Sequence, residues 1–377
     1  MRRLLAVRLD NDGDVLVTGP ALRALATTAE VDLLASPAGA GAARLLPGVA
    51  DVLVFDAPWS GFAPPPVDGA AVESLVRTLA ARAYDAAVVF TSFHQSPLPM
   101  ALLARMAGIG FVAATSEDYP GSLLDVRHRR PEGLHEVEAA LDLARAAGGE
   151  LAARDDGRPA VRHPLPGVAH LVPARPYVVL HPGASVPARA LLPEHAAALA
   201  AALGEAGWPV VVTGGPGERD LAARVAACGA GGVVNLAGRT ELAELAAVLA
   251  GAACVVVGNT GPAHLAAAVG TPVVSLFSPV VPAERWAPYG VPTVLLGDQH
   301  AACRGSRARA CPLPGHPCLS GVTPAEVLDA VAALAGTRGP SHAGVVAPTP
   351  GTAAAPAVTA PAPAVMTPFP ARTEATA

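Results

Sequence analysis

The stretch Cys254–Val274 constrains the fold more than any other part of the chain. Residues 253–257 form an apolar, β-branched run, which predicts a buried parallel strand. Gly261 and Pro262 are typical of a turn that opens a helix, and we expect the Thr260 hydroxyl to cap that helix. The first turn of a helix has unpaired N–H groups and the positive end of the helix dipole, so it attracts anions. An ordinary strand–helix unit without a ligand fits the same pattern.

Strand and helix patterns alternate twice along the 377 residues, which favours two α/β domains. A hydrophobic content of 52% is enough for two cores. We expect strands at 4–9, 31–34, 52–55 and 86–90 and helices at 75–82, 98–107 and 135–147, then strands at 177–180, 210–213, 233–235, 253–257 and 273–277 and helices at 193–203, 221–228 and 323–335. Residues 115–130 are predicted to be an irregular loop. The predicted domains are 1–165, including a linker from about 148, and 166–338, followed by a disordered Pro/Ala/Thr-rich tail at 339–377.

Composition argues against several classes of partner. The net charge is −5, the chain has no lysine, and no arginine cluster is interleaved with aromatic residues, so nucleic acid is not expected to bind. No apolar run reaches the length of a membrane span, and the N-terminus lacks the pattern of a signal peptide. We therefore predict a cytoplasmic protein without a transmembrane segment, and leave peripheral contact with the inner membrane face open.

Three carboxylates, Asp10, Asp12 and Asp14, follow the first predicted strand. Ligands of open α/β sheets bind at the carboxyl ends of strands, which makes these residues site candidates. A calcium loop is excluded, because the glycine is at the fourth place and the twelfth residue is Ala21. A metal-binding Asp-x-Asp pair, helix capping by Asp12 or Asp14, and a general base stay open.

A polar loop follows the predicted strand at 86–90 and contains His94 and Gln95. Its position at a strand end makes both residues candidates for contact with a substrate, although a loop histidine is equally typical of a solvated surface.

Cys303, Cys311 and Cys318 lie in one loop rich in Gly, Pro and Arg. Their spacing matches no common zinc site. A structural metal, a redox-labile pair and plain thiols all stay open, and no metal is expected to serve the reaction.

Four motifs together resemble the ADP-heptose:lipopolysaccharide heptosyltransferase family, glycosyltransferase family 9. They are Gly13-Asp14, the segment 181–185, the segment 214–218 and the turn 259–264. The resemblance implies a GT-B fold, in which two Rossmann-like domains face a cleft. It also implies that the N-terminal half holds the acceptor, with Gly13, His94 and Gln95 on that side, and that the C-terminal half holds the nucleotide-sugar.

The same resemblance implies roles for single residues. It makes Asp14 the general base, and it assigns the donor to Ser185 and Arg189 at the phosphates, Glu218 at the ribose, and Asn259, Thr260, Gly261 and His264 at the diphosphate turn. Arg189 stands where the family usually has Lys, which keeps the charge but changes its geometry. Asn259 stands where the family usually has Asp.

These residues predict a metal-independent, inverting glycosyltransferase that needs no cofactor. It would move a sugar, heptose or a related one, from a nucleoside-diphosphate donor such as ADP-heptose to a hydroxyl acceptor, as in the synthesis of lipopolysaccharide or another cell-surface glycan. A nucleotide-sugar epimerase on the same scaffold and a non-catalytic nucleotide-sugar-binding module are the alternatives.

Overall fold

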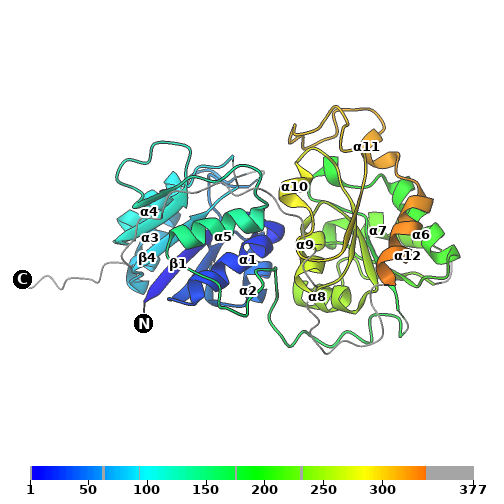
Figure 1. The fold of residues 1–377 in the computed structure, drawn as a ribbon, viewed down its shortest axis with the longest axis horizontal. Coiled ribbons are helices and arrows are strands. Elements are labelled where there is room, and N and C mark those ends of the chain that lie inside the picture. Colours follow the sequence, from blue (N-terminus) through cyan, green and yellow to red (C-terminus); the bar gives the residue numbers. More distant parts are fainter. Residues whose placement is uncertain (1, 62–63, 93, 175, 230–231, 337–377) are drawn as a thin grey trace, which may run out of the picture.

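Two parallel six-stranded sheets, each with helices packed against it, form the two halves of the molecule (Figure 1). The computed structural model describes residues 2–61, 64–92, 94–174, 176–229 and 232–336. The predicted tail at 339–377 lies outside these residues. The predicted α/β architecture with two doubly wound halves is confirmed, whereas the domain boundaries stay predictions.

The N-terminal sheet has the strand order β3-β2-β1-β4-β5-β6. Its elements are β1 Arg3–Arg8, α1 Asp12–Ala26, β2 Glu30–Ala35, α2 Ala40–Leu45, β3 Val49–Val54, α3 Gly69–Arg82, β4 Ala86–Phe90, α4 Leu98–Met106, β5 Phe111–Thr115, β6 Val126–His128 and α5 Glu136–Ala146. The chain reverses its direction of winding between β1 and β4, and the carboxyl ends of strands at such a point are where ligands bind.

The C-terminal sheet repeats this plan with the order β12-β11-β10-β7-β8-β9. Its elements are β7 Val178–His181, η1 Pro187–Arg189, α6 Pro193–Glu205, β8 Val210–Val212, η2 Pro216–Glu218, α7 Arg219–Cys228, β9 Val234–Asn235, α8 Leu242–Gly251, β10 Cys254–Gly258, α9 Gly261–Ala268, β11 Val273–Leu276, α10 Ala283–Trp286, β12 Thr293–Leu296, α11 Pro317–Ser320 and α12 Pro324–Ala335. Here the reversal lies between β7 and β10.

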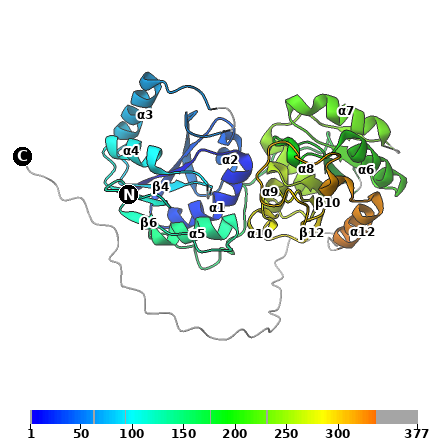
Figure 2. The same ribbon diagram turned by 90° about the horizontal axis from the view of Figure 1, so that it is seen from above.

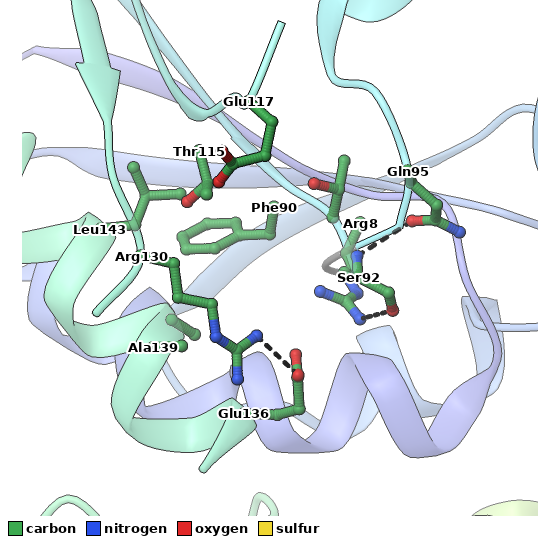
Figure 3. Close-up of a pocket in the computed structure, with 12 residues that line it drawn as sticks. Arg8, Phe90, Ser92, Gln95, Thr115, Glu117, Arg130, Glu136, Ala139 and Leu143 are labelled. Carbon is green, nitrogen blue, oxygen red and sulfur yellow. Dashed lines mark hydrogen bonds and ion pairs between the residues drawn. The ribbon is translucent and has the colours of Figure 1, made fainter. Parts of the chain in front are cut away.

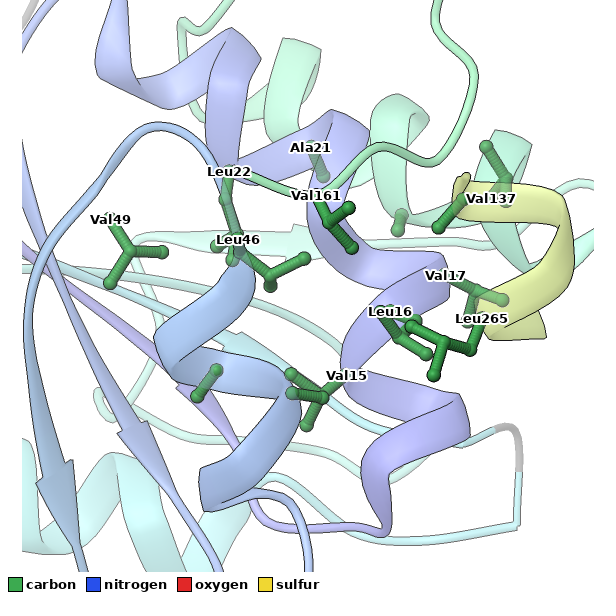
Figure 4. Close-up of a cluster of buried hydrophobic side chains, with 14 of the residues drawn as sticks. Val15, Leu16, Val17, Ala21, Leu22, Leu46, Val49, Val137, Val161 and Leu265 are labelled. Atoms are coloured by element: carbon green, nitrogen blue, oxygen red, sulfur yellow. The ribbon is translucent and has the colours of Figure 1, made fainter. Parts of the chain in front are cut away.

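Helices α1 and α9 bring the two halves into contact, as both views of the molecule show (Figures 1 and 2). Leu16 and Val17 of α1 and Leu265 of α9 belong to one cluster of buried apolar side chains that continues from one half into the other (Figure 4). The carboxyl ends of β1 and β10, which precede these two helices, are therefore held close together. Among the described residues, no helix has both the length and the apolar character needed to span a membrane.

Several local predictions were wrong. The segment at 115–130, predicted as an irregular loop, contains β6, and the strands β5 and β12 were not predicted. The N-cap residue of α1 is Asn11, so neither Asp12 nor Asp14 caps that helix. Thr260 occupies the N-cap position of α9, but its side chain makes no capping hydrogen bond. The hydroxyl that we expected to close the helix end is therefore not used for that purpose.

Candidate active site

A buried arginine organises the carboxylates that follow β1. Arg8 is the last residue of β1, where it pairs in register with Phe90 of β4, and it is 3% exposed. Its Nη2 donates to Asp14 Oδ1 at 2.9 Å and to Ser92 Oγ at 3.0 Å. Its Nε lies 2.9 Å from Asp10 Oδ2. One guanidinium therefore fixes two carboxylates at the edge of the N-terminal sheet where the chain reverses its direction of winding.

Gln95 completes this network from the loop after β4. Its Nε2 donates to Asp10 Oδ1 at 2.6 Å, and its Oε1 accepts from the Ser92 backbone N–H at 3.0 Å. Burial raises the pKa of Asp10, and the opposing charge of Arg8 offsets part of that effect. Gln95 thus supports the carboxylate cluster, while His94, its neighbour, lies exposed and has its pKa lowered by partial burial and by Arg307 of the other half.

A pocket opens beside this network in the N-terminal half (Figure 3). Its walls come from the ends of β1, β4 and β5 and from α5, and the lining residues are Arg8, Phe90, Thr91, Ser92, Gln95, Thr115, Glu117, Arg130, Glu136, Ala139, Ala140 and Leu143. The pocket shares Arg8 and Ser92 with the Asp14 carboxylate. A molecule bound there would be next to the Asp14 carboxylate, to which the family resemblance assigns the role of general base.

Gly13 lies at the contact between the two halves. A Cβ atom added there would be 3.1 Å from His264 Cδ2 and 3.2 Å from Gly261 Cα, closer than side-chain packing normally allows. The first turns of α1 and α9 therefore meet without a side chain between them. Asp14 follows directly after this contact, so the carboxylate is held near the N-terminus of α9.

Arg189 brings a cation to the same region from the C-terminal half. It ends η1, and its Nε is buried and has no hydrogen-bond partner among the described residues. Burial lowers the pKa of Arg189, whereas the negative charge of Asp14 acts to raise it. This electrostatic coupling joins the predicted base to the predicted phosphate-binding residue. An arginine with an unused N–H group next to a helix N-terminus can bind an anion.

His264 is buried in the first turn of α9, with 6% of its surface exposed, and its ring lies 6.3 Å from that of Trp286. Burial lowers its pKa to about 3, and the charges of His135 and Arg189 act in the same direction. Its Nδ1 has no hydrogen-bond partner among the described residues. At neutral pH the ring is uncharged, so it can take part in a hydrogen bond but supplies no positive charge.

A second cluster forms where β7 and β8 end. Glu218 Oε2 accepts from the Gly215 backbone N–H at 2.7 Å and lies 3.7 Å from His181 Nε2. His181 Nδ1 is 3.0 Å from Thr213 Oγ1, and burial lowers the pKa of His181 although Glu218 acts to raise it. A Cβ atom at Gly183 would overlap the Glu218 carboxylate. Gly183 thus leaves room for an acidic side chain at the strand ends, and the Gly215 N–H holds that side chain in place.

Two other residues predicted to bind the nucleotide-sugar donor, Asn259 and Ser185, are not part of these clusters. The Asn259 side chain is 5% exposed and pairs with the backbone of Ser278: its Nδ2 donates to the carbonyl at 3.1 Å, and its Oδ1 accepts from the N–H at 3.2 Å. This amide joins the end of β10 to the residues after β11, so its observed role is structural. Ser185 lies exposed in the loop between β7 and η1.

The three cysteines of the loop before α12 are free thiols, with Cys303 and Cys318 buried and Cys311 half-buried. Burial raises the pKa of Cys318 to about 11, which keeps its thiol protonated and unreactive at neutral pH. Across the part of the chain that the structure describes, no three or more His, Cys, Asp or Glu side chains are grouped so that they could hold a metal ion. The described residues therefore contain no group of three such ligands at these cysteines, and the metal alternatives stay untested.

The sequence did not identify Arg8, Arg130 or Glu136 as site residues. Arg8 had a signal, because a charged residue that ends an otherwise apolar buried strand needs a partner nearby. Glu136 and Arg130 had no such signal in the sequence, because their burial depends on the packing of α5 over the sheet.

Comparisons with known proteins identify relatives of the chain. The sequence profile of glycosyltransferase family 9 (heptosyltransferase) matches residues 72–316, a range that includes Arg189, Glu218 and the Thr260 turn but begins after Asp14. No curated protein matches the sequence.

Solved structures of this family have the same fold. E. coli ADP-heptose lipopolysaccharide heptosyltransferase II is 21% identical with a TM-score of 0.70, and the match covers 89% of this chain and 99% of that chain. The family 9 glycosyltransferase from Veillonella parvula is 16% identical with a TM-score of 0.73, covering 89% and 98%. E. coli heptosyltransferase WaaC with ADP is 23% identical with a TM-score of 0.65, covering 87% and 98%. The predicted GT-B fold is confirmed.

Proposed function

The chain belongs to glycosyltransferase family 9, the heptosyltransferase family, and on that premise we propose that it is an inverting glycosyltransferase. The donor is a nucleoside-diphosphate sugar, such as ADP-heptose, and the acceptor is a hydroxyl group on a glycan, a glycolipid or a small molecule. The predicted cytoplasmic location belongs to the same proposal.

The meeting of the first turns of α1 and α9 at Gly13 is the observation that carries this proposal. This contact brings Asp14 of α1 close to the N-terminus of α9, and the negative charge of Asp14 acts to raise the pKa of Arg189 at the end of η1. Transfer of a sugar from a diphosphate to an alcohol needs both a base for the hydroxyl and positive charge for the leaving group. The two halves supply one requirement each.

Asp14 is the proposed base. Its Oδ1 is held by Arg8 Nη2 at 2.9 Å and lies 3.4 Å from Ser92 Oγ, which is a weak contact. Its Oδ2 has no hydrogen-bond partner among the described residues. The acceptor hydroxyl therefore gives its proton to Oδ2, while Arg8 and Ser92 fix the direction of the carboxylate. Arg8 is a positioning residue in this scheme.

Arg189 and the first turn of α9 are proposed to take the leaving diphosphate. As the acceptor oxygen bonds to the anomeric carbon, the bond from that carbon to the diphosphate oxygen breaks, and negative charge builds up on the leaving group. Arg189 and the helix end stabilise this charge, so the proposal assigns no role to a divalent cation. A single displacement of this kind inverts the anomeric centre.

Glu218 is proposed to bind the ribose of the donor. Its carboxylate is 26% exposed and is oriented by the Gly215 N–H and by His181. A carboxylate accepts hydrogen bonds from a pair of ribose hydroxyls, which is its use in other nucleotide-binding α/β folds. His264 would contribute a neutral hydrogen-bonding ring near the diphosphate.

A screen of nucleotide sugars tests the proposal. ADP-heptose and other ADP-, GDP- and UDP-sugars are incubated with the protein, and unfolding temperature, release of nucleoside diphosphate and sugar transfer are measured. A ligand at 100 times its Kd should stabilise the fold by about 2.7 kcal/mol. Failure of every donor to bind would overturn the proposal. Interconversion of the donor sugar without an acceptor, followed by NMR, would favour an epimerase, and binding without turnover would favour a binding module.

A further inference from the structure

A second contact between the halves lies at the N-terminus of α5, which faces α10 (Figure 2). His135, the N-cap residue of α5, is buried, and its Nε2 lies 2.9 Å from the carbonyl oxygen of Ala287 at the end of α10. The Tyr289 hydroxyl donates to Glu138 Oε1 at 3.3 Å, and the rings of His135 and Tyr289 are 4.7 Å apart between their centroids. The first turn of α5 therefore holds one segment of the other half at two points.

The partners of the His135 ring fix its protonation state. Nδ1 accepts from the Val137 backbone N–H at 3.1 Å, so this nitrogen carries no proton. Nε2 faces a carbonyl oxygen, which can only accept, so this nitrogen carries the one proton of the ring. A second proton, on Nδ1, would point at the Val137 N–H and break the helix cap. The observed contact therefore needs the neutral ring.

The charged and titratable groups around His135 act in opposite directions. Burial lowers the pKa of His135 and the charge of Arg130 acts in the same direction, whereas the contacted carbonyl and Glu138 act to raise it. Burial raises the pKa of Tyr289, so its phenol is uncharged at neutral pH. Burial lowers the pKa of His264, which faces His135 from α9, to about 3. Neither Tyr289 nor His264 therefore changes its charge at mildly acidic pH.

The contact joins elements that carry parts of the candidate site. Glu136, the first residue of α5, lines the N-terminal pocket. Trp286, the last residue of α10, lies with its ring 6.3 Å from that of His264. A change in the contact would therefore move side chains of both halves relative to one another.

We propose that His135 is a pH-sensitive latch between the halves: its neutral ring holds α5 against the segment that ends α10, and its protonation releases that segment. The latch is built from contacts within the chain and does not depend on the proposed function. Opening returns the ring to water, so protonation favours the open form. The latch is therefore closed above the ordinary pKa of histidine, 6.5, and weakens as pH falls below it.

X-ray scattering by the full chain at pH 8 and pH 5.5 tests the latch. The wild type should become more extended at pH 5.5, with a several-fold rise in the ratio of open to closed molecules. His135→Asn keeps an oxygen that can cap α5 but is too short to reach Ala287 as well, so its scattering should not respond to pH. His170→Asn is the control, because His170 is exposed between α5 and β7, and its response should match the wild type.

Two outcomes of this experiment would overturn the inference. One is a wild type that does not open, or that unfolds instead of opening, at pH 5.5, as followed by circular dichroism. The other is an equal response to pH in His135→Asn and in the wild type.

Two measurements at pH 8 test the latch independently. Tyr289→Phe loses the hydrogen bond to Glu138 but keeps the ring, so the ratio of open to closed molecules should rise several-fold. Tyr119→Phe is the matched control, because Tyr119 is 84% exposed. NMR of histidine-labelled protein should show a proton on Nε2 of His135 and none on Nδ1. The opposite tautomer, or equal scattering by Tyr289→Phe and Tyr119→Phe, would contradict the latch.

Discussion

Acid should destabilise the protein through His264. The pKa of this buried ring is lowered from 6.5 to about 3 in the folded chain, chiefly by loss of hydration. A group whose folded pKa is depressed contributes stability that is present above its unfolded pKa and is lost as pH falls towards the folded pKa. The window runs from about pH 6.5 down to about pH 3.

Linkage gives the size of this effect. At pH 5 the unfolded histidine is almost fully protonated while the folded one is neutral, so His264 alone lowers the free energy of unfolding by about 2 kcal/mol relative to pH 8. Burial also lowers the pKa values of His135 and His181, so the wild-type loss should be larger than this. These other histidines remain in a His264 variant, and the difference between the two proteins isolates one ring.

Urea unfolding at pH 8 and pH 5 measures the loss for the wild type and for His264→Gln. The loss in the variant should be smaller by about 2 kcal/mol. Leu265→Ala is the control: the neighbouring residue is fully buried, so this variant is destabilised by about 2–5 kcal/mol without losing a titratable group. Its pH-dependent loss should match the wild type. The same loss in His264→Gln as in the wild type would refute the assignment of a buried, neutral ring.

Three further variants test other parts of the site. Arg8→Met leaves two partly buried carboxylates without their cation and should lower the free energy of unfolding, measured in urea, by about 3–5 kcal/mol. Adding Asp10→Asn should restore part of the lost stability. A loss under 1 kcal/mol in Arg8→Met would contradict the pairing. Gly183→Ala should displace the Glu218 carboxylate and weaken donor binding in calorimetry, whereas unchanged affinity would remove Glu218 from the donor site. Asn259→Asp loses a buried donor to a backbone carbonyl and should lower thermal stability by about 1–3 kcal/mol, whereas a neutral effect would show that the amide is not structural.

Short-range sequence signals made the turn between β10 and α9 predictable. The apolar run before Gly258 and the Gly-Pro pair after Thr260 are short-range signals, and β10 and α9 begin within one residue of their predicted starts. Strand β5, Phe111–Thr115, was missed because its short run resembles the alanine-rich helices around it. Its identity as a strand depends on pairing with β4, which the local sequence does not encode.

The site residues also fall into those that the local sequence identified and those that depend on distant contacts. Asp14 and the Thr260 turn could be identified because each follows a strand and carries recognisable residue types. The contact of Arg8 with Ser92 could not be predicted, because Ser92 is 84 residues away and meets Arg8 only through the pairing of β1 with β4. The neutrality of His264 also depends on burial at the contact with Gly13 in the other half.

Asp14→Asn tests the central claim most directly, namely that α1 supplies the base while η1 and α9 hold the leaving diphosphate. The carboxamide oxygen can keep the hydrogen bond from Arg8, but the side chain can no longer accept the acceptor proton. Sugar transfer should fall about 10²–10⁴-fold while the Kd of the donor stays unchanged. Arg189→Gln should instead weaken donor binding. Full turnover in Asp14→Asn, or a loss of donor affinity equal to the loss of turnover, would contradict the account.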